Sequence, residues 1–188
     1  MEPHDRRRRF ILSLGIYLPL LYGTLGITPY FFRWLLRTLG RDSYNLSITL
    51  FLILASLTIL FFAREQLPRL TLPRLLGLCL VAAGYVAVAY SVSAAAKQLH
   101  TLQYGLLVWM VMESLRGRLA LPQMYLVSTL LTLMAAGIDE SIQAWLPNRN
   151  GQVADVVLDG FSILLAQAAI VLIKDHQELL NAFRKVRK

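Results

Sequence analysis

Long apolar runs, separated by short polar segments, dominate the chain. A helix needs about 20 mostly apolar residues to cross the hydrocarbon core of a bilayer, and the runs approach or reach that length. They span residues 10–28, 44–63, 75–92, 94–115, 123–138 and 156–173. No segment shows the period-two alternation that repeats along the strands of a transmembrane barrel. The pattern therefore predicts an all-α fold, a polytopic membrane bundle of about six transmembrane helices.

Composition supports a membrane protein and argues against a soluble domain. Hydrophobic residues make up 56% of the chain and charged residues 16%, with a mean hydropathy of +0.55. A soluble domain carries roughly a quarter charged residues. The single cysteine, Cys79, excludes an intramolecular disulfide and a cysteine-based zinc site. Because no low-complexity linker divides the chain, we expect residues 1–188 to form a single integral membrane domain.

The basic residues predict topology rather than nucleic-acid binding. The net charge is +8, but the lysines and arginines fall in clusters between the apolar runs and form no common basic face. An even number of spans places both termini on one side, and most of the 19 basic residues lie on that side. The positive-inside rule then predicts that both termini are cytoplasmic, in the cell (inner) membrane. Nucleic acid is not an expected partner.

Two short basic segments resemble interfacial helices. In residues 30–41, Arg33, Arg37 and Arg41 are spaced to share one helical face, with apolar side chains on another. Residues 174–188 combine an apolar stripe with several basic residues. Both patterns fit helices that lie on anionic headgroups, and a simple anchoring role would explain them as well.

Candidate chemistry is concentrated between residues 139 and 159. Asp155 and Asp159 stand at the start of a predicted helix, where the helix dipole favours negative charge. Asp139 and Glu140 stand near the end of the preceding helix, where the dipole opposes them, so they need a partner. Arg149 is the basic residue of the intervening loop.

A second polar group enters from the 94–115 run, where Lys97, His100 and Tyr104 are spaced to share a helical face. Ionisable residues within a span usually face the bundle interior or a wet cavity. We therefore expect one pocket in the outer leaflet. Its predicted lining is His100, Tyr104, Asp139, Glu140, Gln143, Arg149, Asp155 and Asp159.

These motifs resemble the VanZ-like membrane proteins. The matching patterns are Lys97-x-x-His100-x-x-x-Tyr104-Gly105, Asp139-Glu140-x-x-Gln143, Pro147-x-Arg149 and Asp155-Val156-x-x-Asp159-Gly160. They span about residues 94–169, the expected VanZ-like core. The resemblance implies an integral protein of the cell envelope, in a family whose founding member is associated with low-level resistance to the glycopeptide teicoplanin. It implies no particular reaction.

Several functions fit this pocket. In an enzyme, Glu140, His100 and Asp139 would supply general acid and base groups, although no known nucleophile motif is present. In a binder or a lipid transporter, Arg149 would hold a phosphate or carboxylate of a lipid-linked envelope intermediate. The further substrate-binding candidates are Gln143, Tyr104, Asp155 and Asp159.

The remaining alternative is a structural network, in which Arg149 ties the loop to Glu140 and Asp155. No cofactor motif is present, and a guanidinium beside the carboxylates disfavours a metal ion. Membrane lipids are the expected partners, and the sequence leaves the oligomeric state open.

Overall fold

The computed structural model describes residues 3–63, 71–91, 95–147, 149, 151–176 and 178–179. Within these ranges, the side chains of 3–7, 45, 48–49, 51–53, 55–63, 89–91 and 95–101 lie outside the described part. The regular structure of the described residues is helical, which confirms the predicted all-α class. In chain order the elements are α1 (Pro3–Gly23), α2 (Thr28–Ala63), α3 (Leu72–Ser91), α4 (Ala95–Leu115), α5 (Leu121–Trp145), α6 (Val153–Ile170) and the π-helical turn η2 (Val171–Asp175).

Local sequence explains how α5 begins and ends. Gly117, with φ of 79°, turns the chain between α4 and α5 in a conformation that other residues rarely adopt. Pro122 occupies the first turn of α5, where its missing N–H leaves no hydrogen bond unmade. At the far end Leu146 is extended, and Pro147 follows it. These residues fix the length of the helix that carries most of the candidate site.

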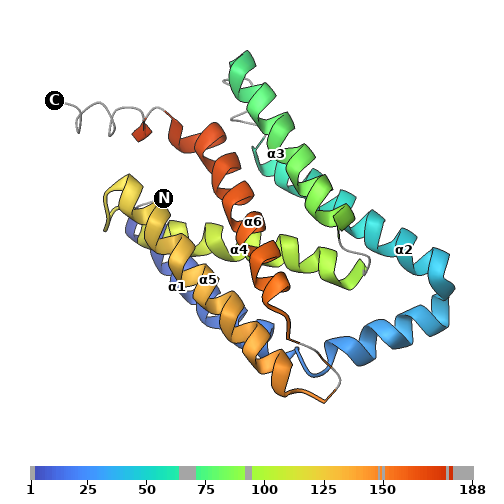
Figure 1. Ribbon diagram of the computed structural model, residues 1–188. Coiled ribbons are helices and arrows are strands. Elements are labelled where there is room, and N and C mark those ends of the chain that lie inside the picture. Colours follow the sequence, from blue (N-terminus) through green and yellow to red (C-terminus); the bar gives the residue numbers. More distant parts are fainter. Residues whose placement is uncertain are drawn as a thin grey trace.

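The predicted interfacial segment and second span are joined in α2, which is interrupted at Gly40 (φ 75°, ψ 166°). Arg41 lies beyond this break, so the helical spacing that would align it with Arg33 and Arg37 does not hold. The helices Arg8–Gly23 and Thr28–Tyr44 meet at an angle of 68°. The first half of α2 therefore extends away from the end of α1 (Figure 1).

Helices α4 and α6 form the centre of the bundle. Helix α4 packs against α1, α5 and α6, and α6 also packs against α5 and α3. The C-terminal ends of α1 and α5 lie near the start of α6 (Figure 1), and we call this the site end. The end of α4, the start of α5 and η2 form the opposite end.

Helix α3 approaches α6 and η2 closely, at one glycine each. A Cβ at Gly84 would stand 2.8 Å from a methyl carbon of Leu165, and one at Gly77 would stand 3.0 Å from Leu172. The hydroxyl of Tyr85 donates a hydrogen bond to the carbonyl of Ser162 at 2.9 Å. The two glycines thus allow α3 to lie close to α6 and η2, and the Tyr85 hydroxyl reaches the backbone of α6.

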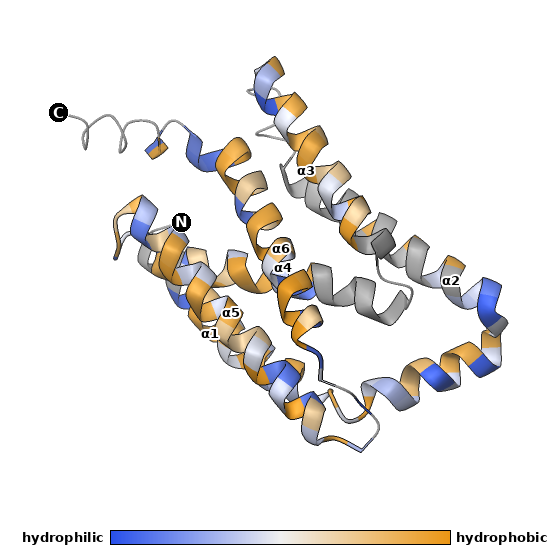
Figure 2. Ribbon diagram, in the orientation of Figure 1, coloured by the Kyte–Doolittle hydropathy of each residue, from blue (hydrophilic) through white to orange (hydrophobic). Residues whose placement is uncertain are grey.

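The bundle has an apolar outside and a partly polar inside, as expected in a bilayer. Large exposed side chains such as Leu80, Leu126 and Phe161 are apolar, and hydrophobic residues line much of α1, α3, α5 and α6 (Figure 2). The buried polar residues of the described part are Glu113, Ser128, Thr132, Asp139, Glu140, Gln143, Asp159, Ser162, Gln167 and Asp175. Burying polar groups is costly unless they are hydrogen-bonded, so these residues locate the specific contacts.

Two helices of the described part are long and apolar enough to cross a membrane, namely Leu121–Trp145 and Val153–Asp175. The bent pair Arg8–Gly23 and Thr28–Tyr44 passes the same test as one broken span. The described apolar portions of α3 and α4, Leu72–Val88 and Leu102–Leu115, are shorter. The helices coincide with the predicted apolar runs, whereas the six-span topology stays a prediction.

Candidate functional site

A tyrosine–aspartate pair lies at the centre of the site, where α4 meets α5. The hydroxyl of Tyr104 donates a hydrogen bond of 2.7 Å to Oδ2 of Asp139. Both residues are fully buried. Hydrogen bonds to a carboxylate are roughly twice as strong as those between neutral groups. The predicted pocket residues Tyr104 and Asp139 are thus in direct contact, and their pairing joins two helices.

Two tyrosines of α1 hold the helices that carry this pair. Tyr17 donates to the carbonyl of Gln103, next to Tyr104, at 3.0 Å. Tyr22 donates to the carbonyl of Ala135, one turn before Asp139, at 3.1 Å. The Asp139 carboxylate also acts electrostatically on both hydroxyls.

The two tyrosines were not predicted as site residues, because the first apolar run has only the general features of a span. The available signal was a pair of phenol hydroxyls in an otherwise apolar helix, since a buried tyrosine hydroxyl usually finds a hydrogen-bond partner.

Glu140 accepts a hydrogen bond that holds the end of the α5–α6 loop against α5. Its Oε1 accepts a bond from Nε2 of Gln143 at 3.2 Å, and its Oε2 accepts one from the backbone N–H of Gln152 at 2.8 Å. Gln152 is the residue just before α6. A carboxylate near the end of α5 is thereby stabilised by the amide that opens the next helix.

Gly151 allows the loop to pass close to α5. A Cβ at this position would collide with the backbone oxygen of Glu140 and stand 2.9 Å from the Cβ of Ala144. Backbone cannot move aside as a flexible side chain can, so the site requires glycine here. Together with the Glu140 bonds, this contact fixes where α6 begins.

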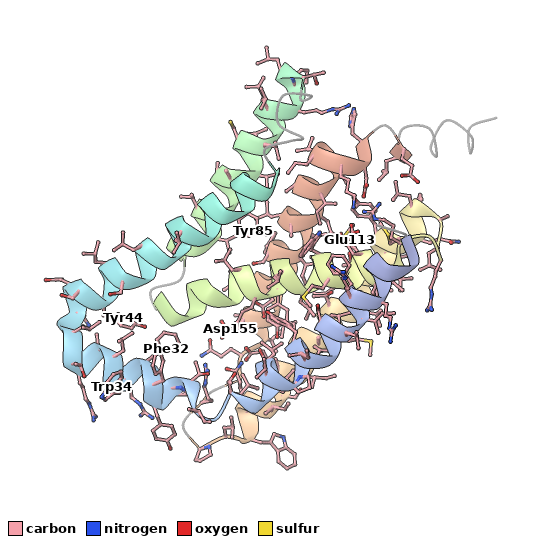
Figure 3. The ribbon with its side chains drawn as sticks, turned by 180° about the vertical axis from the view of Figure 1, so that it is seen from behind. Phe32, Trp34, Tyr44, Tyr85, Glu113 and Asp155 are labelled. Atoms are coloured by element: carbon pink, nitrogen blue, oxygen red, sulfur yellow. The ribbon has the colours of Figure 1, made fainter. Side chains whose placement is uncertain are left out.

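The two aspartates of α6 occupy different environments. Asp159 is buried, and its charge acts on the Tyr104 hydroxyl, so it belongs to the same cluster as Tyr104 and Asp139. Asp155 lies in the first turn of α6, as the dipole argument predicted, and is half-buried (Figure 3).

Arg149 follows the end of α5 and is half-buried. Its Nε is buried and has no hydrogen-bond partner. Among the described residues, no hydrogen bond or ion pair connects its side chain to Glu140 or Asp155. The structural tether that the sequence suggested for Arg149 is therefore absent from the described contacts.

The prediction for His100 lies outside the described side chains, as does that for Lys97. The backbone of α4 places His100 one turn before Tyr104. The described residues contain no group of three or more His, Cys, Asp or Glu side chains that is arranged to hold a metal ion. The chemistry of the described site is thus that of carboxylates, amides, phenols and one guanidinium.

A second charged cluster, at the opposite end, was not predicted. Arg116 binds Asp175 through two parallel bonds of 3.0 Å, and its Nε donates to Glu113 at 3.0 Å. Tyr125 donates to Asp175 at 2.9 Å, and Lys174 donates to Glu113 at 2.6 Å. This cluster ties α4, α5 and η2 together.

The charges of this cluster compensate one another. Burial lowers the pKa of Arg116, but the hydrogen bonds to Asp175 and the charge of Glu113 outweigh burial and raise that pKa above its usual value. From the sequence, Arg116 and Lys174 contributed only to the predicted membrane topology. The Glu113–Arg116 spacing of three was a signal for a pair on one helix face.

Between the two clusters, α5 and α6 are joined by a glutamine. Nε2 of Gln167 donates to the carbonyl of Tyr125 and to Oγ of Ser128, each at 3.0 Å. Its Oε1 accepts a bond of 2.9 Å from Thr129. Thr132, one turn further along α5, is fully buried, and its hydroxyl has no hydrogen-bond partner. Polar contacts therefore recur along the α5–α6 interface from one end towards the other.

Comparison with known proteins gives one match. A family model described as VanZ/LLP1 matches residues 46–174, which include every predicted site residue and begin well before the core expected at about residue 94. Neither a curated protein nor a solved structure matches the chain.

Proposed function

The chain belongs to the VanZ/LLP1 family, and we propose that it is a multi-pass protein of the cell membrane that binds a lipid-linked phosphate in an outer-leaflet pocket. The observation that carries the proposal is Arg149, a half-buried arginine with no partner for its buried Nε. Arg116 is satisfied by carboxylates within the protein, whereas the Nε of Arg74, in the first turn of α3, also has no hydrogen-bond partner.

Arginine is suited to a phosphate ligand. Its planar guanidinium presents parallel N–H donors that match phosphate oxygens, and the pairing is charge-assisted. A partly buried cation that has no anionic partner among the described residues costs free energy, which a bound anion would recover. Because the loop of Arg149 joins the ends of two apolar helices, a phosphate there would be at headgroup level with its lipid chains in the bilayer.

The carboxylates favour binding over catalysis. Oε1 of Glu140 accepts a hydrogen bond from Gln143 of the same helix, and Oε2 accepts one from the backbone N–H that precedes α6. Oδ2 of Asp139 accepts one from Tyr104 deep in the bundle. These contacts suit residues that position Arg149 and the start of α6. An envelope enzyme that modifies the same lipid would use Glu140, Asp139 or His100 as acid and base, and its Glu140→Gln variant would bind lipid but not turn it over.

Binding a lipid-linked cell-wall intermediate would connect this protein to glycopeptide resistance, because glycopeptides act on such intermediates outside the cell. Loss of teicoplanin tolerance in a strain with Arg149→Ala, but not in one with Arg118→Ala, would support that connection. Arg118 is an exposed arginine at the opposite end and serves as the control. Equal teicoplanin tolerance in both strains would argue against a connection to glycopeptide resistance.

The proposed topology has six spans with both termini in the cytoplasm. Two substitutions test it in a Cys79→Ser background, because Cys79 is exposed. A cysteine at Trp145, which is 90% exposed at the site end, should react with an impermeant maleimide added to intact cells. A cysteine at Arg118 should react only after the membrane is opened. The reverse pattern would invert the topology and place the pocket in the inner leaflet.

The binding proposal is tested by native mass spectrometry of protein mixed with polyprenyl phosphate. Wild type should retain the phosphate-bearing lipid and should not retain the matching polyprenol without phosphate. Arg149→Ala should lose the adduct, and Arg149→Lys should keep part of it. Retention of both lipids by wild type and by Arg149→Ala would mean that the protein recognises the polyprenyl chain and not the phosphate.

A further inference from the structure

The first half of α2, residues 28–39, has no role in the pocket contacts described above. We propose that it lies in the headgroup layer at the site end and gathers anionic phospholipids there. Its assignment to the outer leaflet follows the proposed topology, whereas its preference for anionic lipid is independent of both the topology and the phosphate pocket.

The backbone sets this segment apart as a short, tilted helix. It is bounded by the 68° bend after α1 and by the break at Gly40. A helix of this length extends about 18 Å, at 1.5 Å per residue, and cannot cross a hydrocarbon core of about 30 Å. A steep angle to α1, which the proposed topology places in the membrane, brings it towards the plane of the bilayer.

Local contacts hold the segment at this angle. Backbone hydrogen bonds stabilise the connection to α1, since the N–H groups of Thr24, Ile27 and Thr28 donate to preceding carbonyls. Leu25, within this connection, is buried. Across the break at Gly40, the ring of Phe32 packs edge-on against the ring of Tyr44, with centroids 6.2 Å apart (Figure 3). The segment is thus fixed at both ends.

Its exposed surface combines aromatic rings with arginines. Tyr30, Phe31 and Trp34 are 55%, 51% and 59% exposed, which is unusual for such large rings unless lipid or another molecule covers them. Tyrosine and tryptophan are enriched where the bilayer meets water. These rings would sit at the boundary between headgroups and acyl chains.

Charge complementarity selects the occupant. Arg33 and Arg37 are exposed and one helical turn apart, and residues 28–39 contain no acidic residue. The Arg33 guanidinium stacks 4.9 Å above the Tyr30 ring, and its Nε donates to the carbonyl of Pro29. Neither arginine has an ion pair with a carboxylate of the described residues. Two exposed guanidiniums with no carboxylate partner among the described residues, beside exposed aromatic rings, match an anionic phospholipid surface.

The segment is also close in sequence to a residue that contacts the candidate site. It begins six residues after Tyr22, whose hydroxyl contacts the turn of α5 before Asp139. Lipids held there would border the site end, where the proposed phosphate lipid must enter.

Brominated-lipid quenching tests the proposal on the full-length protein. In a variant with Trp109→Phe and Trp145→Phe, Trp34 is the single fluorophore, and the protein is reconstituted in vesicles that contain either brominated phosphatidylglycerol or brominated phosphatidylcholine at equal mole fraction. Phosphatidylglycerol should quench Trp34 more strongly. A surface arginine contributes about fivefold enrichment, the equivalent of about 1 kcal/mol, so Arg33→Gln with Arg37→Gln should remove most of the difference.

A matched reporter separates this surface from general effects. With Trp145 as the single fluorophore, in Trp34→Phe and Trp109→Phe, the two arginine substitutions should not change quenching. Equal quenching of Trp34 by both lipids would refute the preference for anionic lipid. No quenching by either lipid would show that the segment lies outside the bilayer, covered by protein or water instead. Arg149→Ala should leave the Trp34 result unchanged, so this test can fail without the phosphate pocket failing.

Discussion

Replacing Tyr104 with phenylalanine removes one hydroxyl from the centre of the site and leaves the ring in place. The hydroxyl donates to Asp139 at 2.7 Å, and both residues are fully buried. Hydrogen bonds to charged groups contribute about 1.5–3 kcal/mol, although polar contacts between membrane helices average lower in double-mutant cycles. We therefore take the lower end of the range for charged groups and expect Tyr104→Phe to reduce the free energy of unfolding by about 1.5 kcal/mol.

Two other tyrosines provide internal calibration. Tyr22→Phe removes a bond to a backbone carbonyl at 3.1 Å, and a neutral bond of this kind contributes about 0.5–1.5 kcal/mol. Tyr30 is exposed, so Tyr30→Phe should change stability by less than about 0.5 kcal/mol. The predicted order of destabilisation is Tyr104, then Tyr22, then Tyr30.

Reversible unfolding in mixed micelles of a mild detergent and dodecyl sulfate measures these differences. A cycle with Asp139→Asn isolates the contact, because the effect of Tyr104→Phe should shrink once the carboxylate is gone. If Tyr104→Phe unfolds like Tyr30→Phe, or if its effect is the same with and without the Asp139 carboxylate, the pair does not join α4 and α5 as described.

Three further changes test other contacts by the same unfolding measurement. Asp175→Asn should destabilise by about 3 kcal/mol or more, because it leaves the half-buried Arg116 without its bidentate partner; wild-type stability would contradict the ion pair. Gly151→Ala should destabilise by more than about 1 kcal/mol through its clash with α5, whereas Gly137→Ala, with open space around it, should be neutral or stabilising by up to about 1 kcal/mol; equal effects would refute the close approach. Thr132→Val replaces a buried hydroxyl without a partner and should be neutral or stabilising, and a clear loss of stability would reveal a bound water at that hydroxyl.

The helices were predictable because a bilayer imposes a strong pattern on sequence. Each apolar run corresponds to a helix, and α5 continues to Trp145, beyond the apolar run at 123–138. The break at Gly40 was not predicted, since an isolated glycine inside an apolar or amphipathic stretch is compatible with a continuous helix. One consequence was the incorrect alignment of Arg41 with Arg33 and Arg37.

The site was predictable only where its residues are close in sequence or share a motif. Tyr104 and Asp139 were both predicted as site residues, and they are hydrogen-bonded to each other. The partners of Glu140 were not foreseen, because one is a backbone N–H, and backbone donors carry no signature in sequence. The tyrosines of α1 and the Arg116–Asp175 pair join residues 59 or more positions apart, so their contacts depend on how the helices pack.

The central claim is that Arg149 binds the phosphate of a membrane lipid. The most direct measurement is a titration of the protein in nanodiscs with polyprenyl phosphate, comparing wild type, Arg149→Ala and Arg118→Ala. A charge-assisted contact of about 1.5–3 kcal/mol predicts that Arg149→Ala raises Kd at least about tenfold, while Arg118→Ala leaves it unchanged. Equal affinity of Arg149→Ala and wild type would contradict the account, because the pocket would then hold its lipid without the guanidinium.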